Sequence, residues 1–182
     1  MAEPRRIWWA RPRKLCALER PGGGGRSHRP ERREAEIEYL KGRGVHLVIS
    51  VMRTRHNLAA YESAGLEWRH VPVGVSTAAL EELLPLLRRE LRRSGAVAVH
   101  GDRRTGFVSA LCAAHLHESR GHDPVASLAA AAAAGLDAGE EACALVGVDP
   151  RELERRLNAA RAMPACRLSP PASGPLRRRR RR

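Results

Sequence analysis

A chain of 182 residues is long enough for one domain with a substantial core and too short for two domains of ordinary size. The net charge of +13 lies at the ends, because residues 1–34 carry +6, residues 35–166 carry no net charge, and residues 167–182 carry +7. The overall basicity therefore says little about the ligand of the folded part, although the ends can bind polyanions or an anionic surface.

The cysteine and hydropathy patterns exclude two classes of protein. Cys16, Cys112, Cys143 and Cys166 are widely spaced and form no C-x-x-C pair, which is unlike a secreted disulfide scaffold. No run approaches the ~20 apolar residues that a transmembrane helix needs. We expect reduced thiols and a cytoplasmic location, with no metal site and no cofactor.

The first predicted elements are two edge strands, a loop and a helix. Residues 7–9 and 14–18 have the aromatic and aliphatic character of short strands. The glycines at 22–25 are not followed by the Lys-Ser/Thr of a P-loop, so this stretch is interpreted as a linker. A helical pattern then begins at Glu31 and ends at Gly42 or Gly44.

The central strand is predicted at residues 45–51, VHLVISV, because a continuous β-branched run is typical of a strand buried on both faces of a parallel sheet. The following loop contains Arg53, Arg55 and His56. These side chains leave the carboxyl end of the strand, which is where open α/β sheets bind ligands.

The next elements alternate between helix and strand. Residues 58–64 predict a short helix, residues 66–71 a strand, and residues 72–75 a loop. Leucines at helical spacing predict a long helix from 77 to 94. Pro85 lies inside it, so we expect either a kink or a later start.

Residues 96–111, AVAVHGDRRTGFVSAL, predict a strand that ends at His100, a tight turn and a helix that runs to about residue 118. The free amides of the first helical turn, with Arg103 and Arg104 nearby, would form an anion site. The alternative is a purely structural turn, in which Asp102 caps the helix and the arginines are solvated.

Asp123-Pro124 and Asp149-Pro150 predict helices at 124–134 and 150–162, with another at 137–146. The alternation predicts an α/β fold, with a mostly parallel sheet of about four to five strands flanked by helices. We expect a disordered N-terminus at 1–6, one domain at 7–162, and a disordered Pro/Arg-rich tail at 163–182.

The segments GVHLVISV, LEWRHVPV, TAALEELLPLL and VAVHGDRRTG resemble the small dual-specificity branch of the protein tyrosine phosphatases. The resemblance runs over roughly residues 7–162. It implies a loop of His-Cys-(five residues)-Arg-Ser/Thr whose amides hold phosphate. In that family the Cys thiolate attacks phosphorus, the Arg holds phosphate oxygens, and an Asp on the preceding loop protonates the leaving group.

Compared with this motif, the chain keeps some residues and lacks the reactive ones. His100 matches the His, and Arg104, Thr105 and Gly106 match the Arg-Ser/Thr-Gly. Gly101 takes the place of the nucleophile. Three residues separate the His from the Arg where the family has six, so the loop is three residues short. The general acid is missing as well, because the expected Pro-Asp is Pro72-Val73.

These departures lead to three functional hypotheses. The first is a phosphatase-like binding or regulatory module without cysteine catalysis, whose ligand is anionic or phosphorylated. The second is an active phosphomonoesterase in which His100 is nucleophile or base. The third is a non-specific polyanion binder, such as a nucleic-acid or acidic-surface binder, that acts through the basic ends. The candidate anion-binding residues are Gly101, Asp102, Arg103, Arg104, Thr105, Gly106 and Arg55.

Overall fold

The computed structural model describes residues 2–23, 28–101 and 106–162. Its elements follow the order β-β-α-β-α-β-α-β and then four helices. They are β1 (Ile7–Arg11), β2 (Leu15–Glu19), α1 (Pro30–Gly42), β3 (Val45–Ser50), α2 (Leu58–Ser63), β4 (Glu67–His70), α3 (Thr77–Leu91), β5 (Ala96–Gly101), α4 (Phe107–Arg120), α5 (Pro124–Ala133), α6 (Glu140–Val146) and α7 (Pro150–Ala162).

The five strands form one sheet in the order β1-β2-β5-β3-β4. β1 pairs antiparallel with β2, and the other three pairings are parallel. The predicted fold class is therefore confirmed. The two central strands, β3 and β5, carry the most β-branched sequence, as expected for strands with both faces covered.

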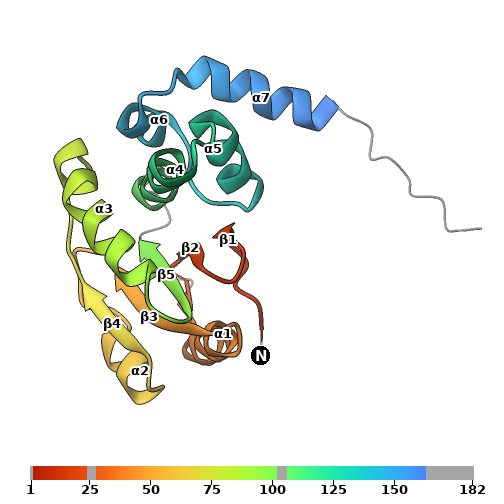
Figure 1. Cartoon of the computed structure of the whole chain (residues 1–182). Helices are drawn as coiled ribbons and strands as arrows, with labels where there is room; N and C mark the ends of the chain where they lie inside the picture. The colour runs from red at the N-terminus through yellow and green to blue at the C-terminus, as the bar shows by residue number, and fades with distance from the viewer. Residues whose placement is uncertain (1, 24–27, 102–105, 163–182) are drawn as a thin grey trace, which may run out of the picture.

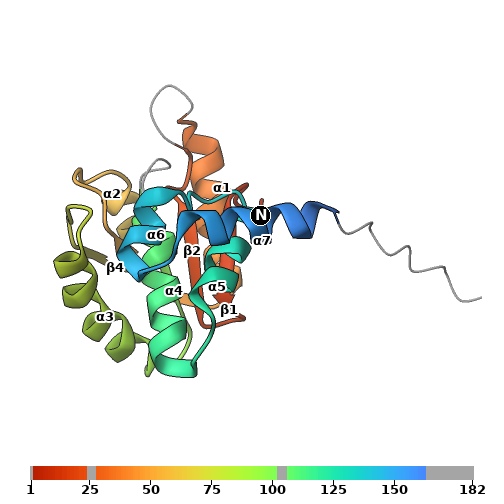
Figure 2. The same cartoon turned by 90° about the horizontal axis from the view of Figure 1, so that it is seen from above.

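Helices cover both faces of the sheet, and the sheet separates the hydrophobic core into two layers (Figure 1). One face carries Leu47, Val97 and Val99 and packs against α3 and α4. The other face carries Val48, Ala96 and Ala98 and packs against α1 and α2. Seen from above, α4, α5, α6 and α7 gather over the first face (Figure 2).

Local sequence signals place several helix ends correctly. Asp123 accepts a hydrogen bond from the amide of Val125 and caps α5, as predicted. Asp149 accepts from the amide of Arg151 in the same way at the start of α7. Such side-chain caps satisfy amides that the first helical turn leaves unpaired.

Other boundaries differ from the prediction. α3 begins at Thr77, as predicted, and is capped by Ser76, but it ends at Leu91 and not at 94. Of the two alternatives at Pro85, the later start is wrong, because Pro85 lies inside the helix. α6 begins at Glu140 and not at 137, because the Asp137 carboxylate accepts from the amide of Gly139 in a turn that precedes the helix.

The structure describes the N-terminal residues from 2 onward, but it does not describe the C-terminal residues after 162. Within the segment expected to be an unstructured N-terminus, Glu3 accepts a hydrogen bond from Tyr39 Oη and Arg6 pairs with Glu19. The predicted Pro/Arg-rich tail at 163–182 lies outside the described residues. No helix of the described ranges has the length and apolar character to cross a membrane.

Candidate functional site

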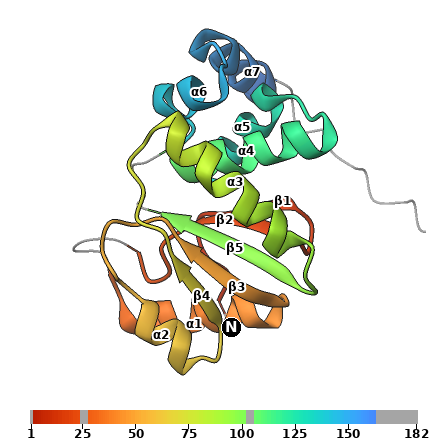
Figure 3. The ribbon, with the colours of Figure 1, turned by 60° about the vertical axis from the view of Figure 1, so that its left-hand side comes forward.

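The carboxyl ends of four parallel strands meet at one edge of the sheet (Figure 3). His100 on β5 pairs in register with Leu18 on β2 and with Ser50 on β3, which in turn pairs with His70 on β4. The loops that leave these strands therefore start side by side. This is the edge at which open α/β sheets bind ligands.

Hydrogen bonds beyond the strands hold these loops together. The amide of Val51 donates to the carbonyl of His100 over 3.0 Å, and the amide of Val71 donates to Ser50 over 2.9 Å. Asn57 Nδ2 donates to the carbonyl of Pro21 over 2.7 Å and so joins the loop after β3 to the loop after β2.

The structure describes only part of the predicted anion site. Gly101 is the last residue of β5 and is buried, and Gly106 is the N-cap of α4. Asp102, Arg103, Arg104 and Thr105 lie outside the described residues. The described parts confirm the strand and the helix on either side of the turn.

The alternative in which Asp102 caps the helix stays a prediction, because Asp102 lies outside the described residues. α4 begins at Phe107, so Gly106 occupies the N-cap position and offers no side chain of its own to cap the helix. The amide of Gly106 instead donates to Glu141 Oε2, over 3.0 Å, from the first turn of α6. The anion at this helix end thus comes from a residue 35 positions later in the chain.

His100 lies in the interior and has no exposed surface. Its Nε2 is 3.0 Å from Tyr61 Oη, while Nδ1 has no partner among the described residues. Burial, and then the charges of Arg20 and His70, lower the pKa of His100 to about 3. The imidazole is therefore neutral near pH 7 and closed off from solvent.

Arg55 is exposed on the loop after β3, together with Arg53 and His56. Neither arginine pairs with a carboxylate of the described residues. The loop follows β3, next to β5, so the structure places Arg55 at the predicted edge of the sheet.

Arg20 is a charged residue at this edge that sequence reasoning missed. It follows β2, and its amide donates to the carbonyl of Gly101 over 3.3 Å. The side chain is buried, and its Nε and Nη2 donate to the carbonyl of Gly23 over 2.9 and 2.6 Å. Because this guanidinium pairs with no carboxylate of the described residues, its positive charge acts on the neighbouring groups.

The three described cysteines, Cys16, Cys112 and Cys143, are buried. Burial raises the pKa of Cys112 to about 12 and raises the pKa of Cys16 well above its usual value. Burial, followed by the charges of Asp149 and Glu140, also raises the pKa of Cys143. These thiols are protonated near pH 7, whereas a cysteine nucleophile reacts as the thiolate.

The loop between β4 and α3 has an apolar surface. Val71 to Val75 read VPVGV, and Val75 is 38% exposed. No carboxylate occurs between His70 and Thr77, so this loop offers no acid to protonate a leaving group.

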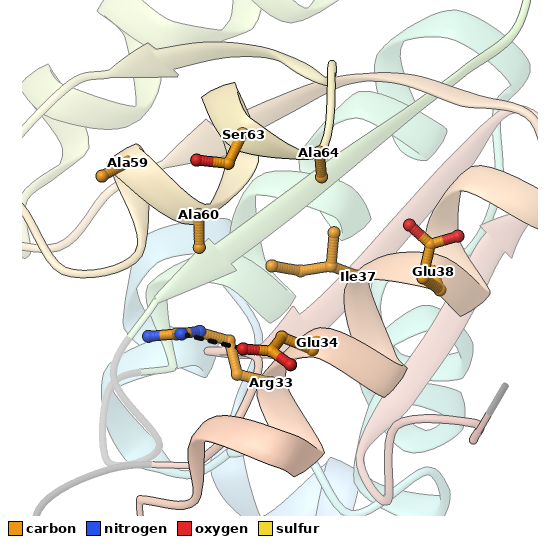
Figure 4. A pocket seen from close by; sticks show the side chains of 8 residues that line it. All are labelled: Arg33, Glu34, Ile37, Glu38, Ala59, Ala60, Ser63 and Ala64. Atoms are coloured by element: carbon orange, nitrogen blue, oxygen red, sulfur yellow. Dashed lines mark ion pairs between the residues drawn. The ribbon is translucent and has the colours of Figure 1, made fainter.

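A groove of about 460 Å³ lies elsewhere, between α1 and α2 (Figure 4). Ile37, Ala60 and Ala64 form its apolar wall, and Arg33 pairs with Glu34 at its rim over 3.5 Å. None of the predicted site residues lines it. Within the described ranges, no cluster of three or more histidine, cysteine or acidic side chains could hold a metal ion.

Comparisons with known proteins identify the fold. No family model matches the chain, and no curated protein does. Among solved structures, the chain is similar to Tk-PTP in its active form, with a TM-score of 0.59 and 20% identity over 83% of this chain and 97% of that one. It is also similar to human DUSP28, with a TM-score of 0.57 and 19% identity over 88% of this chain and 100% of that one.

A third similar structure is a mouse putative dual specificity phosphatase complexed with zinc tungstate. Its TM-score is 0.59, with 20% identity over 88% of this chain and 94% of that one. The chain therefore has the fold of the small dual-specificity phosphatases. Sequence identities near 20% establish that fold and leave the chemistry to be argued from the residues.

Proposed function

We propose that this phosphatase-fold domain is a pseudophosphatase, a binding or regulatory module for an anionic or phosphorylated ligand that lacks cysteine-dependent catalysis. The observation that carries the proposal is Gly101 at the end of β5, where the resemblance places the nucleophile. Glycine has no side chain with which to attack phosphorus.

Two further observations support the absence of this chemistry. Cys16, Cys112 and Cys143 are buried, and their thiols have raised pKa values. The loop that carries the acid in the family reads Pro72-Val73. A nucleophile and a general acid would both have to be supplied by other residues.

The charges at the sheet edge support an anionic ligand. Arg53 and Arg55 are exposed on the loop after β3, and Arg20 is buried at the start of the loop after β2. The N-terminus of α4 faces the same edge and adds the positive end of a 14-residue helix. Arg104, matched to the phosphate-holding arginine of the family, would complete the site.

The environment of His100 favours binding over the phosphomonoesterase hypothesis. A nucleophile or base must reach the substrate, but His100 is fully buried and its Nε2 is engaged with Tyr61. Its pKa of about 3 also makes it a weak base. Its position suits a residue that supports the end of β5 from within the core.

We expect Arg104→Ala to weaken the binding of inorganic phosphate or tungstate at least about tenfold, because the charge-assisted hydrogen bonds of one guanidinium are lost. Isothermal titration calorimetry measures this in the whole chain. Arg92→Ala is the matched control, because Arg92 is exposed at the far end of α3.

A second control removes residues 167–182, which carry seven arginines. Phosphate binding at the sheet edge should survive this deletion, whereas polyanion binding through the tail should be lost and should fall steeply with salt. Equal affinities of the wild type and Arg104→Ala would contradict the proposed site.

A further inference from the structure

A second hollow lies where β1 runs beside α4 and α5 (Figures 1 and 2). Its volume is about 420 Å³, which is within the range of pockets that bind small organic ligands. The apolar part of its wall combines Trp8 and Ala10 of β1 with Leu116 of α4 and with Ala126 and Ala130 of α5. None of these residues belongs to the candidate anion site.

A bulge in β1 turns Arg11 toward the side of the sheet on which this hollow lies. Trp8 pairs with Ala17, and Arg11 pairs with Leu15. β1 therefore has one residue more than β2 between these two pairs. In a regular strand, side chains three positions apart point to opposite faces. Ala17 and Leu15 both lie in the core layer that packs against α4, so Trp8 and Arg11 share that face.

Arg120 of α4 brings a second positive charge to this end of the hollow. It follows Leu116 by one helical turn, so it lies on the same side of the helix. The pKa of Arg11 is lowered by burial and then by the charge of Arg120, which shows that the two guanidinium groups are close. Neither forms an ion pair with a carboxylate of the described residues. Two like charges held together repel each other and favour the binding of an anion.

The two polar side chains of the wall that belong to the start of α5 differ in their partners. Asp123 accepts from the amide of Val125 over 2.9 Å, and its other oxygen lies 3.9 Å from Arg156, so its charge is already compensated. Ser127 is only 6% exposed, and its hydroxyl has no hydrogen-bond partner among the described residues. A buried hydroxyl without a partner costs free energy, which a polar group of a ligand would recover.

We propose that this hollow binds a nucleoside monophosphate, with the base against the indole of Trp8 and the phosphate between Arg11 and Arg120. An indole face stacks on any nucleobase, and a guanidinium binds phosphate through paired hydrogen bonds. Along the strand, Trp8 and Arg11 lie about 10 Å apart. The ribose of a nucleotide spans such a separation, whereas in phosphotyrosine the phosphate is attached directly to the ring.

The hollow is separate from the candidate anion site. Gly106 precedes the first turn of α4, whereas Leu116 and Arg120 lie in its last two turns. A helix of 14 residues is about 20 Å long, so one ligand of this size cannot occupy both sites. The inference therefore does not depend on the proposed function.

Isothermal titration calorimetry of the whole chain with adenosine monophosphate, adenosine and inorganic phosphate tests the proposal. The nucleotide should bind at least about tenfold more tightly than adenosine or phosphate alone, because it makes both kinds of contact at once. Equal affinities for the nucleotide and for inorganic phosphate would overturn the proposal, since the base would then contribute nothing. Tighter binding of free phosphotyrosine than of the nucleotide would also overturn it.

Arg120→Gln removes one of the two charges. The affinity for adenosine monophosphate should fall about five- to tenfold, while the affinity for adenosine stays unchanged. Arg69→Gln is the matched control, because Arg69 is exposed on β4 at the opposite edge of the sheet. Arg104→Ala should also leave nucleotide binding unchanged. Equal affinities of Arg120→Gln and Arg69→Gln, or a loss in Arg104→Ala as large as that in Arg120→Gln, would overturn the proposal.

Ala130→Leu fills the hollow without changing its charge. Ala130 is exposed on α5 and leucine is a good helix former, so the fold should be retained. Both adenosine and its monophosphate should bind more weakly than they bind to the control Ala78→Leu, whose residue is exposed on α3. Nucleotide binding that is the same in both variants places the base elsewhere and overturns the proposal.

The indole resonance of Trp8 reports directly on the base. Its Nε1–H signal, assigned by its loss in Trp8→Phe, should shift when adenosine monophosphate is added to the wild type. The signal of Trp68 on β4 should not shift. A Trp8 signal that stays unchanged while the nucleotide binds would overturn the stacking.

Discussion

Gly106→Ala should lower the free energy of unfolding by about 2–3 kcal/mol. The added methyl group would lie 2.7 Å from Ala142 Cβ and 2.9 Å from the Ala142 backbone nitrogen. Backbone cannot move aside as a flexible side chain can, so α6 has to shift away from α4. That shift also strains the hydrogen bond between Gly106 and Glu141.

The measurement is the denaturant midpoint or the melting temperature, which should fall by about 5–10 °C in a chain of this size. Gly74→Ala is the matched control, because nothing lies within 4 Å of a methyl group at Gly74. Its stability should stay within about 1 kcal/mol of wild type. A Gly106→Ala protein as stable as Gly74→Ala would mean that α4 and α6 do not pack as described.

Acidification from pH 7 to pH 5 should destabilise the fold by about 2 kcal/mol through His100 alone. Its pKa is about 3 in the folded protein and near 6.5 in an unfolded chain. Between these values the unfolded chain binds more protons, so stability is complete above about pH 6.5 and is lost as the pH falls toward 3. His115 is buried and its ring nitrogens have no partner among the described residues. Its pKa is lowered to about 4 by burial and then by nearby arginines, so it adds to the loss of stability in acid.

Urea unfolding at several pH values measures this dependence. His100→Gln should remove about half of the stability loss between pH 7 and pH 5, because the His115 contribution remains. His117→Gln should leave the loss unchanged, since His117 is exposed on α4. If the free energy of unfolding of His100→Gln falls with pH as steeply as that of the wild type, His100 is not buried in its neutral form.

Much of the fold could be predicted because its signals are local. The β-branched run at β3, the leucine stripe of α3 and the Asp-Pro pairs before α5 and α7 each act within a few residues. Parallel strands bring their carboxyl ends to one edge, so the position of the candidate site followed from the order of elements.

The contacts at the site could not be predicted in this way. Glu141 reaches Gly106 across 35 residues, and Tyr61 reaches His100 across 39. Local sequence also gives no sign that a carboxylate from α6 accepts from the Gly106 amide at the start of α4. Arg20 resembles any other arginine in a chain with 31 of them, and only the fold shows that it is buried beside Gly101.

The carboxyl edge of the sheet combines positive charge at its surface with a neutral interior. The sheet edge offers positive charge from exposed arginines and from the end of α4, while its interior holds a neutral His100 paired with Tyr61. The raised pKa of Tyr61, caused by burial, keeps this pair uncharged. This arrangement agrees with the proposed binding of an anion without cysteine catalysis.

The most direct test of the central claim is the hydrolysis of a generic aryl phosphate by the purified whole chain. We predict no turnover above the buffer rate for the wild type and none for His100→Ala, while phosphate or tungstate still binds in calorimetry. Turnover that His100→Ala or the loss of any one cysteine abolishes would contradict the account and establish an active phosphatase.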